Sequence, residues 1–372
     1  MRTRLVLASL LAALVLAAPA HARVPSGGPP PVGHVFVIFL ENENADTSFG
    51  PDSPAPYLAE GLPARGVFIP NYYGVTHLSL GNYVAMISGQ GSNPQTQADC
   101  QVYSDFAGGA IGPDGQALGN GCVYPATVKT IADQLTDHGL SWKGYMEDMG
   151  NDTTREAALC GRPQLNTQDN TQNATPSDQY AARHNPFVYF HSIVDDPVSC
   201  EQHDVPLTQF ESDIRSRGTT PNFSFITPNL CHDGHDTSCK NGEPGGLVSA
   251  DTFLRRWVPI ILKSPAYTRD GLLIVTFDEA EAETSNQDAS ACCNEAQFPN
   301  TPNNGGPVPG MGGGRVGAVA LSRYIAPGTT TQTSYNHFSL LRSLEALFHL
   351  PYLGYANTPN PGMFGSDVFN RH

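Results

Sequence analysis

Three largely apolar runs along the chain each stop abruptly at polar residues. The runs cover residues 35–40, 223–226 and 272–275 and consist mainly of valine, isoleucine, leucine and phenylalanine. Short runs of this kind, without regular polar alternation, are typical of strands that are buried on both faces of a sheet. A fourth apolar run, 315–321, predicts a further strand.

Segments with helical periodicity lie between the apolar runs. Apolar residues recur on one face over 127–138, 207–216 and 247–262, and four leucines predict a last helix that begins near His337. Strands that alternate with helices predict an α/β fold with a mostly parallel central sheet flanked by helices. A polar, glycine-rich stretch at 90–125 and a polar stretch with few aliphatic residues at 150–178 are expected to be surface insertions. The segment 280–314 is expected to be a rim or lid over the site.

Polar side chains follow three of the predicted strands. Ligands of open α/β sheets bind at the carboxyl ends of the strands, so these side chains are expected to meet at one edge. Their carboxylate and amide oxygens suit a divalent metal ion, and magnesium, manganese, calcium and zinc all remain open. The residues are Glu41 and Asn42 after the first strand, Asn229, Asp233 and His235 after the second, and Asp278 and Glu279 after the third.

A hydroxyl group stands at the start of another predicted helix. Ser79 precedes Tyr83, Val84 and Ile87 at helical spacing, and Gly89 ends the segment. The amides and the positive dipole of a helix N-terminus favour a phosphate, so a serine there is well placed for phosphoryl chemistry. Two alternatives stay open: Thr76 as the reactive hydroxyl, and Ser79 as an ordinary helix cap.

Several blocks resemble a known family. The segment ENENADTSFG, residues 41–50, looks like the ENRSFDHYFG-type signature of the phosphoesterase family of bacterial acid phosphatases and phospholipases C, within the alkaline phosphatase superfamily. SLGNYVAMISG, residues 79–89, is similar to the segment around the superfamily's nucleophile. HNPF at His184 and NHFSLLR at His337 resemble two further blocks of the family. The resemblance implies an alkaline phosphatase-like fold.

The resemblance also implies roles for individual residues. Ser79 would be the nucleophile that forms a phosphoseryl intermediate, with His235 and His337 as further catalytic residues. His184 and Asn229 would contact the substrate; a structural role for His184 is the alternative. Glu279 departs from the more usual aspartate or histidine, which leaves open whether it binds the metal directly. The implied metal ligands are Glu41, Asn42, Asp278, Glu279 and, for a second ion, Asp233.

The first residues have the pattern of an export signal. Arg2 and Arg4 precede an apolar run over 5–18, and Ala20-His21-Ala22 forms a small-residue cleavage site. We expect residues 1–22 to be a signal peptide and residues 23–372 to be one phosphoesterase domain, secreted or periplasmic. The apolar run is shorter than the roughly 20 residues that a membrane span requires, so no stable membrane anchor is expected.

Charge and cysteine content narrow the function further. The formal net charge is −15, and loss of Arg2 and Arg4 makes it more negative, which argues against nucleic acid as a partner. Eight cysteines in an exported chain predict disulfides. Pairing of neighbours gives 100–122, 160–200 and 231–239, and leaves 292 and 293 as a possible vicinal pair. A thiolate metal cluster is the alternative, but the chain has no CxxC pair.

These observations predict an exported, metal-dependent phosphoesterase. An acid phosphatase-like phosphomonoesterase is favoured, with a phosphorylated small molecule or a phospholipid headgroup as the substrate. The alternatives are a phospholipase C-type phosphodiesterase and an inactive phosphate- or metal-binding protein. A serine hydrolase is disfavoured because the chain has no GxSxG motif.

Overall fold

A central sheet of eight strands organises the computed structural model, which describes residues 28–235, 239–282 and 286–371. The expected signal peptide, residues 1–22, lies outside the described residues. The strand order is β13-β2-β12-β11-β1-β10-β7-β9. The strands are β1 (His34–Leu40), β2 (Val67–Ile69), β7 (Trp142–Met146), β9 (Asp204–Pro206), β10 (Phe223–Thr227), β11 (Gly271–Phe277), β12 (Ala318–Ser322) and β13 (Thr329–Thr330).

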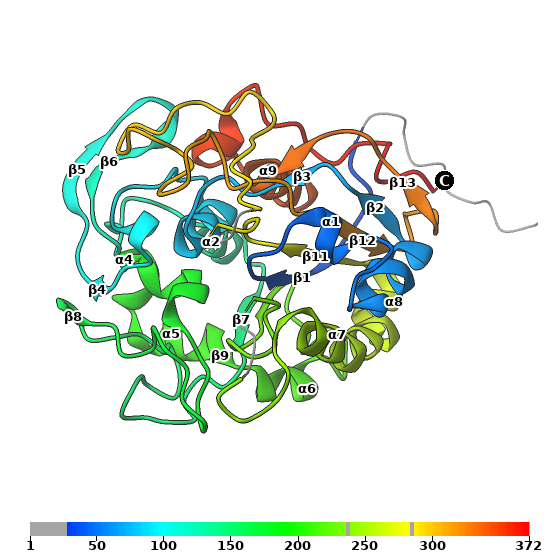
Figure 1. The fold of residues 1–372 in the computed structure, drawn as a ribbon, viewed down its shortest axis with the longest axis horizontal. Helices are drawn as coiled ribbons and strands as arrows, with labels where there is room; N and C mark the ends of the chain where they lie inside the picture. Colours follow the sequence, from blue (N-terminus) through cyan, green and yellow to red (C-terminus); the bar gives the residue numbers. More distant parts are fainter. Residues whose placement is uncertain (1–27, 236–238, 283–285, 372) are drawn as a thin grey trace, which may run out of the picture.

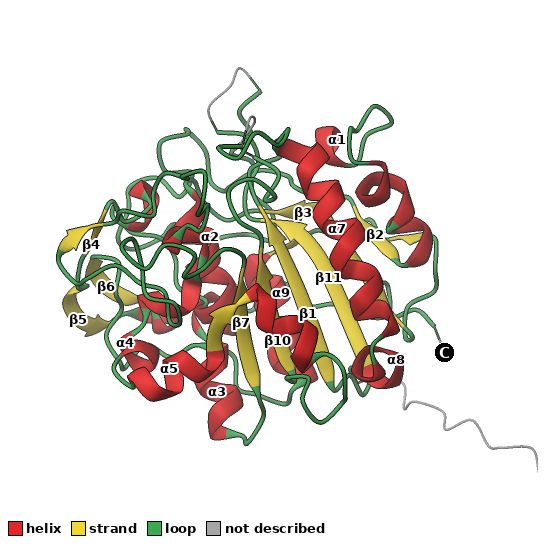
Figure 2. Ribbon diagram, turned by 90° about the horizontal axis from the view of Figure 1, so that it is seen from below, coloured by secondary structure: helices red, strands yellow, loops and turns green. Residues whose placement is uncertain are grey.

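Helices cover both faces of this sheet. Figure 1 shows α2 and α9 on one side of β1 and β11, and α7 and α8 on the other side. Figure 2 shows α7 running alongside β11. This three-layer arrangement confirms the predicted α/β fold. The helices are α1 (Ala45–Ser48), α2 (Ser79–Ser88), α3 (Ile131–Asp137), α4 (His191–Val194), α5 (Pro197–His203), α6 (Phe210–Asp213), α7 (Gly246–Lys263), α8 (Pro265–Asp270) and α9 (His337–Leu347).

The sheet is mostly parallel, as predicted. The central strand β1 pairs in parallel with β11 and β10, and β7 and β9 continue the parallel part. Every residue of β1 is fully or almost fully buried, which explains its continuous apolar sequence. The strand predicted at 315–321 is β12, and it runs antiparallel to β11. An antiparallel strand near the edge is common in sheets of this kind.

Register brings two of the polar strand ends together. Leu40 lies opposite Phe277, so Glu41 and Asp278 are the next residues on neighbouring strands. The Asp278 N–H donates to the Leu40 carbonyl at 2.9 Å, and the Glu41 N–H donates to the Asp233 carbonyl at 2.8 Å. The two strand ends and the loop after β10 are thus joined by backbone hydrogen bonds.

Two predicted helices differ in extent from the expectation. The helix at 127–138 begins only at Ile131, because Thr130 and Asp133 form a reciprocal capping box there. The helix at 207–216 is divided into a 3₁₀ turn, Leu207–Gln209, and α6. By contrast α2 ends as predicted, since Gly89 adopts a left-handed conformation with a φ of 69°.

The cysteines form the four predicted disulfides, 100–122, 160–200, 231–239 and 292–293. The first closes the 90–125 insertion, which contains β4 (Val102–Tyr103) and the hairpin of β5 (Ala107–Ile111) and β6 (Ala117–Asn120). β4 pairs with β8 (Thr167–Gln168) of the second insertion. A last small pair joins β3 (Tyr72–Tyr73) and β14 (Tyr335–Asn336), next to the starts of α2 and α9.

Candidate active site

The Ser79 hydroxyl lies between two carboxylates. Ser79 is the first residue of α2, and its Oγ donates to Glu41 Oε2 at 2.8 Å and lies 3.2 Å from Glu279 Oε1. Tyr83, one turn further along α2, donates to Glu41 Oε1 at 2.7 Å. One helix therefore supplies both hydroxyl groups that contact Glu41, because residues four apart share a helix face.

His77 contacts the Glu279 oxygen that does not face Ser79. The Nδ1 atom of His77 contacts Glu279 Oε2, and its Nε2 lies 3.0 Å from the Asp288 carbonyl. Burial lowers the pKa of His77 to about 4, so the ring is neutral and donates one hydrogen bond only. The Nε2–H donates to Asp288, which leaves Nδ1 to share a proton with Glu279. Burial, followed by the nearby Asp99 and Glu41, raises the pKa of Glu279 well above its usual value.

Asp278 and Asn42 each present a buried oxygen to the same region. The N–H groups of Asn42 and Glu279 donate to Asp278 Oδ1 at 3.1 and 2.6 Å. Among the described residues, Asp278 Oδ2 and Asn42 Oδ1 have no hydrogen-bond donor although both atoms are buried. Buried oxygens are nearly always satisfied, so these two atoms point to a group outside the polypeptide.

A cation fits this set of side chains. Burial raises the pKa of Glu41 to about 7, and burial together with Glu41 and Glu279 raises the pKa of Asp278 well above its usual range. Carboxylates buried side by side ionise reluctantly unless a positive charge joins them. Hard oxygen donors of this kind are the ligands that magnesium, manganese and calcium prefer.

The described residues also hold two tight groups of metal-binding residue types. They are Cys160, Cys200 and Asp204, and Cys231, His232 and Glu243. All of their cysteines are in disulfides, so neither group offers a thiolate ligand. The carboxylates of Glu41, Asp278 and Glu279 are not among these tight groups.

His184 reaches Glu41 from a third element. Its Nε2 lies 3.2 Å from Glu41 Oε1 but is not oriented for a hydrogen bond, and its ring stacks on Tyr83 at 5.3 Å. Burial, and then the positive charge of Arg183, lower the pKa of His184 well below 6.5. A neutral imidazole beside Glu41 has a ring N–H to offer a ligand, so contact of His184 with substrate stays a prediction.

His337, predicted to be a catalytic residue, makes a hydrogen bond with each of its ring nitrogens. His337 Nε2 lies 2.5 Å from the Asp278 carbonyl, and Tyr72 OH lies 3.2 Å from its Nδ1. Burial lowers the pKa of His337 to about 4, so a neutral ring with Nε2–H donates to Asp278 and accepts from Tyr72. Both ring nitrogens are occupied in this way, and a catalytic role for His337 stays a prediction.

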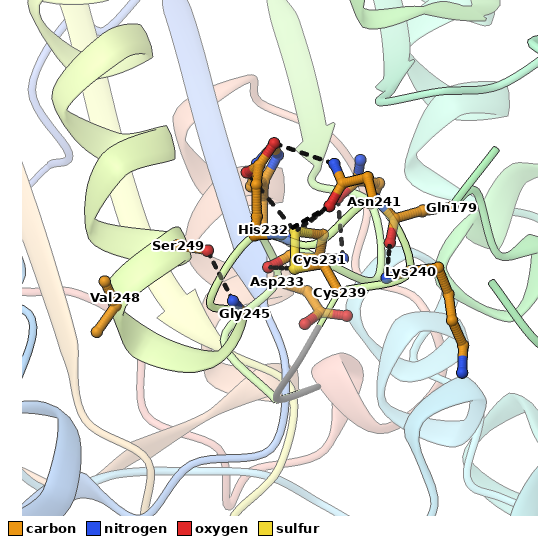
Figure 3. Close-up of a disulfide and its surroundings, with 12 residues drawn as sticks. Gln179, Cys231, His232, Asp233, Cys239, Lys240, Asn241, Gly245, Val248 and Ser249 are labelled. Atoms are coloured by element: carbon orange, nitrogen blue, oxygen red, sulfur yellow. Dashed lines mark hydrogen bonds and ion pairs between the residues drawn. A yellow bond between two sulfur atoms is a disulfide. The ribbon is translucent and has the colours of Figure 1, made fainter. Parts of the chain in front are cut away.

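The loop after β10 carries the remaining predicted residues. Figure 3 shows Asp233 beside the Cys231–Cys239 disulfide, which closes this loop. Asp233 is buried, and its Oδ1 accepts from the His235 N–H at 3.0 Å. His235 makes this contact through its backbone, so a catalytic role for its side chain stays a prediction.

Asn229 is engaged elsewhere. Its side-chain amide donates to Asp148 Oδ2 at 2.8 Å, and its Oδ1 accepts from the N–H groups of Cys231 and His232. These bonds organise the turn that leads to Asp233. Contact of Asn229 with substrate is not indicated by them and stays a prediction.

Thr76, the alternative nucleophile, is tied into the structure. It is fully buried, and its Oγ1 donates to the Asn304 carbonyl at 2.7 Å and accepts from Gln97 Nε2 at 3.1 Å. Residues 74–77 are thereby joined to the 280–314 segment, with the Gly313 N–H donating to the Gly74 carbonyl. That segment thus supports the approach to Ser79, while its action as a lid stays a prediction.

Comparison with known proteins agrees with this geometry. The Phosphoesterase family matches residues 56–351, which is most of the chain. The chain belongs to the Phosphoesterase family. The matched span begins after Glu41 and Asn42 and includes Ser79, Asp278 and Glu279. The predicted family is therefore confirmed.

Relatives of this phosphoesterase include acid phosphatases. A phosphate-repressible acid phosphatase of Penicillium chrysogenum is 28% identical over 85% of this chain and 59% of its own length. A phosphatidylinositol-3-phosphatase of Mycobacterium tuberculosis is 25% identical over 95% of this chain and 89% of its own length. The chain spans less than two thirds of the length of the fungal acid phosphatases that it matches.

Solved structures support the fold of this phosphoesterase. A protein of the alkaline phosphatase superfamily from Vibrio parahaemolyticus has a TM-score of 0.51 at 13% identity, covering 91% of this chain and 72% of that chain. Murine ectonucleotide pyrophosphatase/phosphodiesterase 5 has a TM-score of 0.51 at 12% identity, covering 89% and 98%. The predicted alkaline phosphatase-like fold is confirmed.

Sequence reasoning missed four side chains around the cluster in this phosphoesterase. Tyr83 had a usable signal, because it lies four residues after Ser79 on the same helix. Arg183 had a weaker signal, its position directly before His184. Its positive charge lowers the pKa of Glu41, against the larger effect of burial. His77 and Asp99 had no sequence signal of a functional role, because only the folded backbone brings them to the site. Asp99 accepts from the Leu80 N–H at 3.0 Å and lies 3.8 Å from Arg183.

Proposed function

We propose that this protein is a metal-dependent phosphomonoesterase that acts through a phosphoseryl intermediate. The observation that carries the proposal is the position of the Ser79 hydroxyl, at the N-terminus of α2 and between Glu41 and Glu279. A hydroxyl within reach of two carboxylates has both a proton acceptor and a nearby site for a cation. The family and the names of the relatives support phosphate esters as the substrates.

Glu41, Asn42, Asp278 and Glu279 would hold the metal ion, and Asp233 would join them if a second ion binds. Two of the oxygens involved, Asn42 Oδ1 and Asp278 Oδ2, lack a donor among the described residues. When bound, a divalent cation supplies positive charge for the phosphoryl oxygens and lowers the pKa of a nearby hydroxyl. The identity of the ion is left to experiment.

The reaction would proceed in two displacements. Ser79 Oγ forms a bond to phosphorus while the bond between phosphorus and the leaving alcohol oxygen breaks, and the Ser79 proton passes to a neighbouring carboxylate. His235, on the loop that also carries Asp233, would protonate the departing oxygen. A water molecule then attacks phosphorus, the serine ester breaks, and Ser79 recovers a proton as inorganic phosphate leaves.

The remaining side chains would set the geometry of this reaction. Tyr83 holds one Glu41 oxygen, so that the other oxygen faces Ser79. His77 orients Glu279, and His337 fixes the Asp278 backbone. Arg183 and His184 would contact the phosphate, because both lie on the segment that approaches Glu41.

The substrate would be a phosphate monoester on a small molecule or on a phospholipid headgroup. The fungal relatives named acid phosphatase favour the first, whereas the mycobacterial phosphatidylinositol-3-phosphatase, which this chain matches over most of both lengths, favours the second. A phospholipase C-type diesterase is the alternative within the same family. Among the described residues, no helix is both long and apolar enough to cross a bilayer.

Export to an oxidising compartment completes the proposal. The leader pattern of residues 1–22 and the four disulfides both support secretion or a periplasmic location. Intramolecular disulfides persist in such compartments and are rare in the cytosol.

The test is an assay of protein lacking residues 1–22 against p-nitrophenyl phosphate, bis-p-nitrophenyl phosphate and phosphatidylcholine, with and without a chelator. We expect chelator-sensitive turnover of the monoester, and rapid acid quenching should trap phosphate on Ser79. Turnover of the diester alone would favour the phospholipase C-type alternative. Phosphate binding without any turnover would instead indicate an inactive binding protein.

A further inference from the structure

A second pocket lies apart from the carboxylate cluster. It has a volume of about 160 Å³ and sits where the 280–314 segment meets the start of α9 and the 3₁₀ turn Gly354–Asn357. None of the residues proposed for catalysis or metal binding lines it. Its principal walls are Asp114, Cys293, Glu295, Phe338 and Tyr355.

Glu295 brings a buried carboxyl group to this pocket. Its Oε2 accepts from Asn336 Nδ2 at 3.2 Å, while its Oε1 is buried without a hydrogen-bond partner among the described residues. A buried carboxyl oxygen that makes no hydrogen bond destabilises the folded protein. A ligand that offers positive charge or a donor would remove that cost.

The lining of the pocket holds two acidic side chains, Asp114 and Glu295, and no basic group among the described residues. Burial raises the pKa of Glu295 well above its usual value, and a cation beside the carboxyl group would favour its ionised form. Asp114, Glu295 and Tyr355 line the same pocket, and the two acidic groups raise the pKa of Tyr355, after the larger effect of burial. Arg342 donates to the Thr358 carbonyl nearby, but its guanidinium lies over the Tyr352 ring, 4.4 Å from the centroid, and does not line the pocket.

Aromatic rings complete the walls. Tyr355 and Phe338 line the pocket and meet edge to face with centroids 5.2 Å apart. Phe298, which does not line the pocket, stacks on Tyr355 at 5.5 Å. These rings are nearly fully buried and so hold fixed positions. Aromatic faces together with carboxylates attract organic cations, and quaternary ammonium groups are bound in this way.

The volume limits the size of the ligand. A cavity of about 150 Å³ holds one benzene molecule, which has six heavy atoms. The pocket is of that size, so it accepts a tetramethylammonium- or choline-sized group, whereas a hexose has about twice as many heavy atoms as benzene.

From this combination we propose that the pocket is a binding site for a small organic ammonium ion. The ion would sit against Tyr355 and Phe338 with Glu295 and Asp114 as its counter-charges. This site goes beyond the proposed phosphatase activity and does not depend on it, because the two sites share no lining residue.

Calorimetric titration of the full chain with tetramethylammonium chloride tests the proposal, with sodium chloride as the blank. We expect saturable binding, weakened at least tenfold in Glu295→Gln and about threefold in Asp114→Asn. Asp114 is exposed and has a φ of 56°, a conformation that asparagine tolerates, so this second variant is expected to fold. Glu60→Gln, which removes an exposed carboxylate elsewhere, should bind as the unchanged protein does.

Tert-butyl alcohol, a neutral molecule of similar size, separates charge from shape. We expect no binding of this alcohol under the same conditions. The proposal is overturned if tetramethylammonium shows no saturable binding, if the alcohol binds equally well, or if Asp114→Asn and Glu295→Gln bind like Glu60→Gln.

Discussion

Ser79 Oγ donates a hydrogen bond to Glu41 Oε2 over 2.8 Å, although the two residues belong to different elements of the fold. Glu41 follows the central strand β1, and Ser79 begins α2. The bond joins the predicted nucleophile to the first predicted metal ligand. It also explains why Ser79 is buried at the mouth of a helix instead of facing solvent as a simple cap.

Replacement of Ser79 tests the assignment of the nucleophile. Ser79→Ala should lower kcat by several orders of magnitude while metal affinity stays within a few-fold, because only the attacking oxygen is lost. Steady-state kinetics and metal titration check both values. Thr76→Ser, the matched control, keeps the hydroxyl that bonds to Asn304 and should retain most activity. Phosphate trapped on Thr76 in quenched enzyme would reverse the two roles.

Removal of divalent ions tests the role of the carboxylate cluster. Dialysis against a chelator should abolish turnover, because Asn42 Oδ1 and Asp278 Oδ2 would lose the group that they face. Addition of magnesium, manganese, calcium or zinc in turn should restore it to different extents and identify the preferred ion. Full activity in protein shown by elemental analysis to be metal-free would contradict the prediction.

His77 is expected to set the affinity for the metal through Glu279. His77→Ala should weaken metal binding by about 10- to 100-fold, the usual effect of losing a side chain that orients a ligand. His77→Asn places an amide near the position of Nδ1 and should recover part of the loss. Equilibrium dialysis measures the affinity without reference to catalysis, and equal affinity in all three proteins would rule out this positioning role.

His232 should make stability depend on pH. Burial lowers its pKa, but hydrogen bonds to Glu147 and Glu243 outweigh this effect and raise the pKa to about 9. Between about pH 6.5 and 9 only the folded protein holds the His232 proton. Its contribution to the free energy of unfolding is therefore fully present below about pH 6.5 and is lost as the pH rises towards 9. The loss should be on the order of 1–2 kcal/mol after allowance for solvent screening.

Thermal unfolding measured from pH 6 to 9.5 tests this expectation. His232→Gln keeps a donor but cannot be protonated, so its Tm should fall less over this range than that of the unchanged protein. Parallel pH profiles of the two proteins would show that another group is responsible.

The local sequence determined the strands, the polar residues that follow them and the disulfides. A continuous apolar run such as 35–40 has one stable environment, the interior of a sheet, and the residues that follow it must emerge at an edge. Glu41, Asn42, Asp278 and Glu279 were therefore identified as neighbours from pattern and family resemblance together. The predicted pairing of cysteines that are neighbours in the sequence is confirmed, because each disulfide closes its own short segment.

Only the tertiary structure decided which partners complete the site. His77 contacts Glu279 across about 200 residues of chain, and Tyr83 contacts Glu41 across about 40. No local periodicity encodes such contacts. The same holds for His337, whose ring nitrogens contact the Asp278 carbonyl and the Tyr72 hydroxyl. Sequence patterns report the burial of each segment, whereas hydrogen bonding between distant side chains depends on where the folded backbone places them.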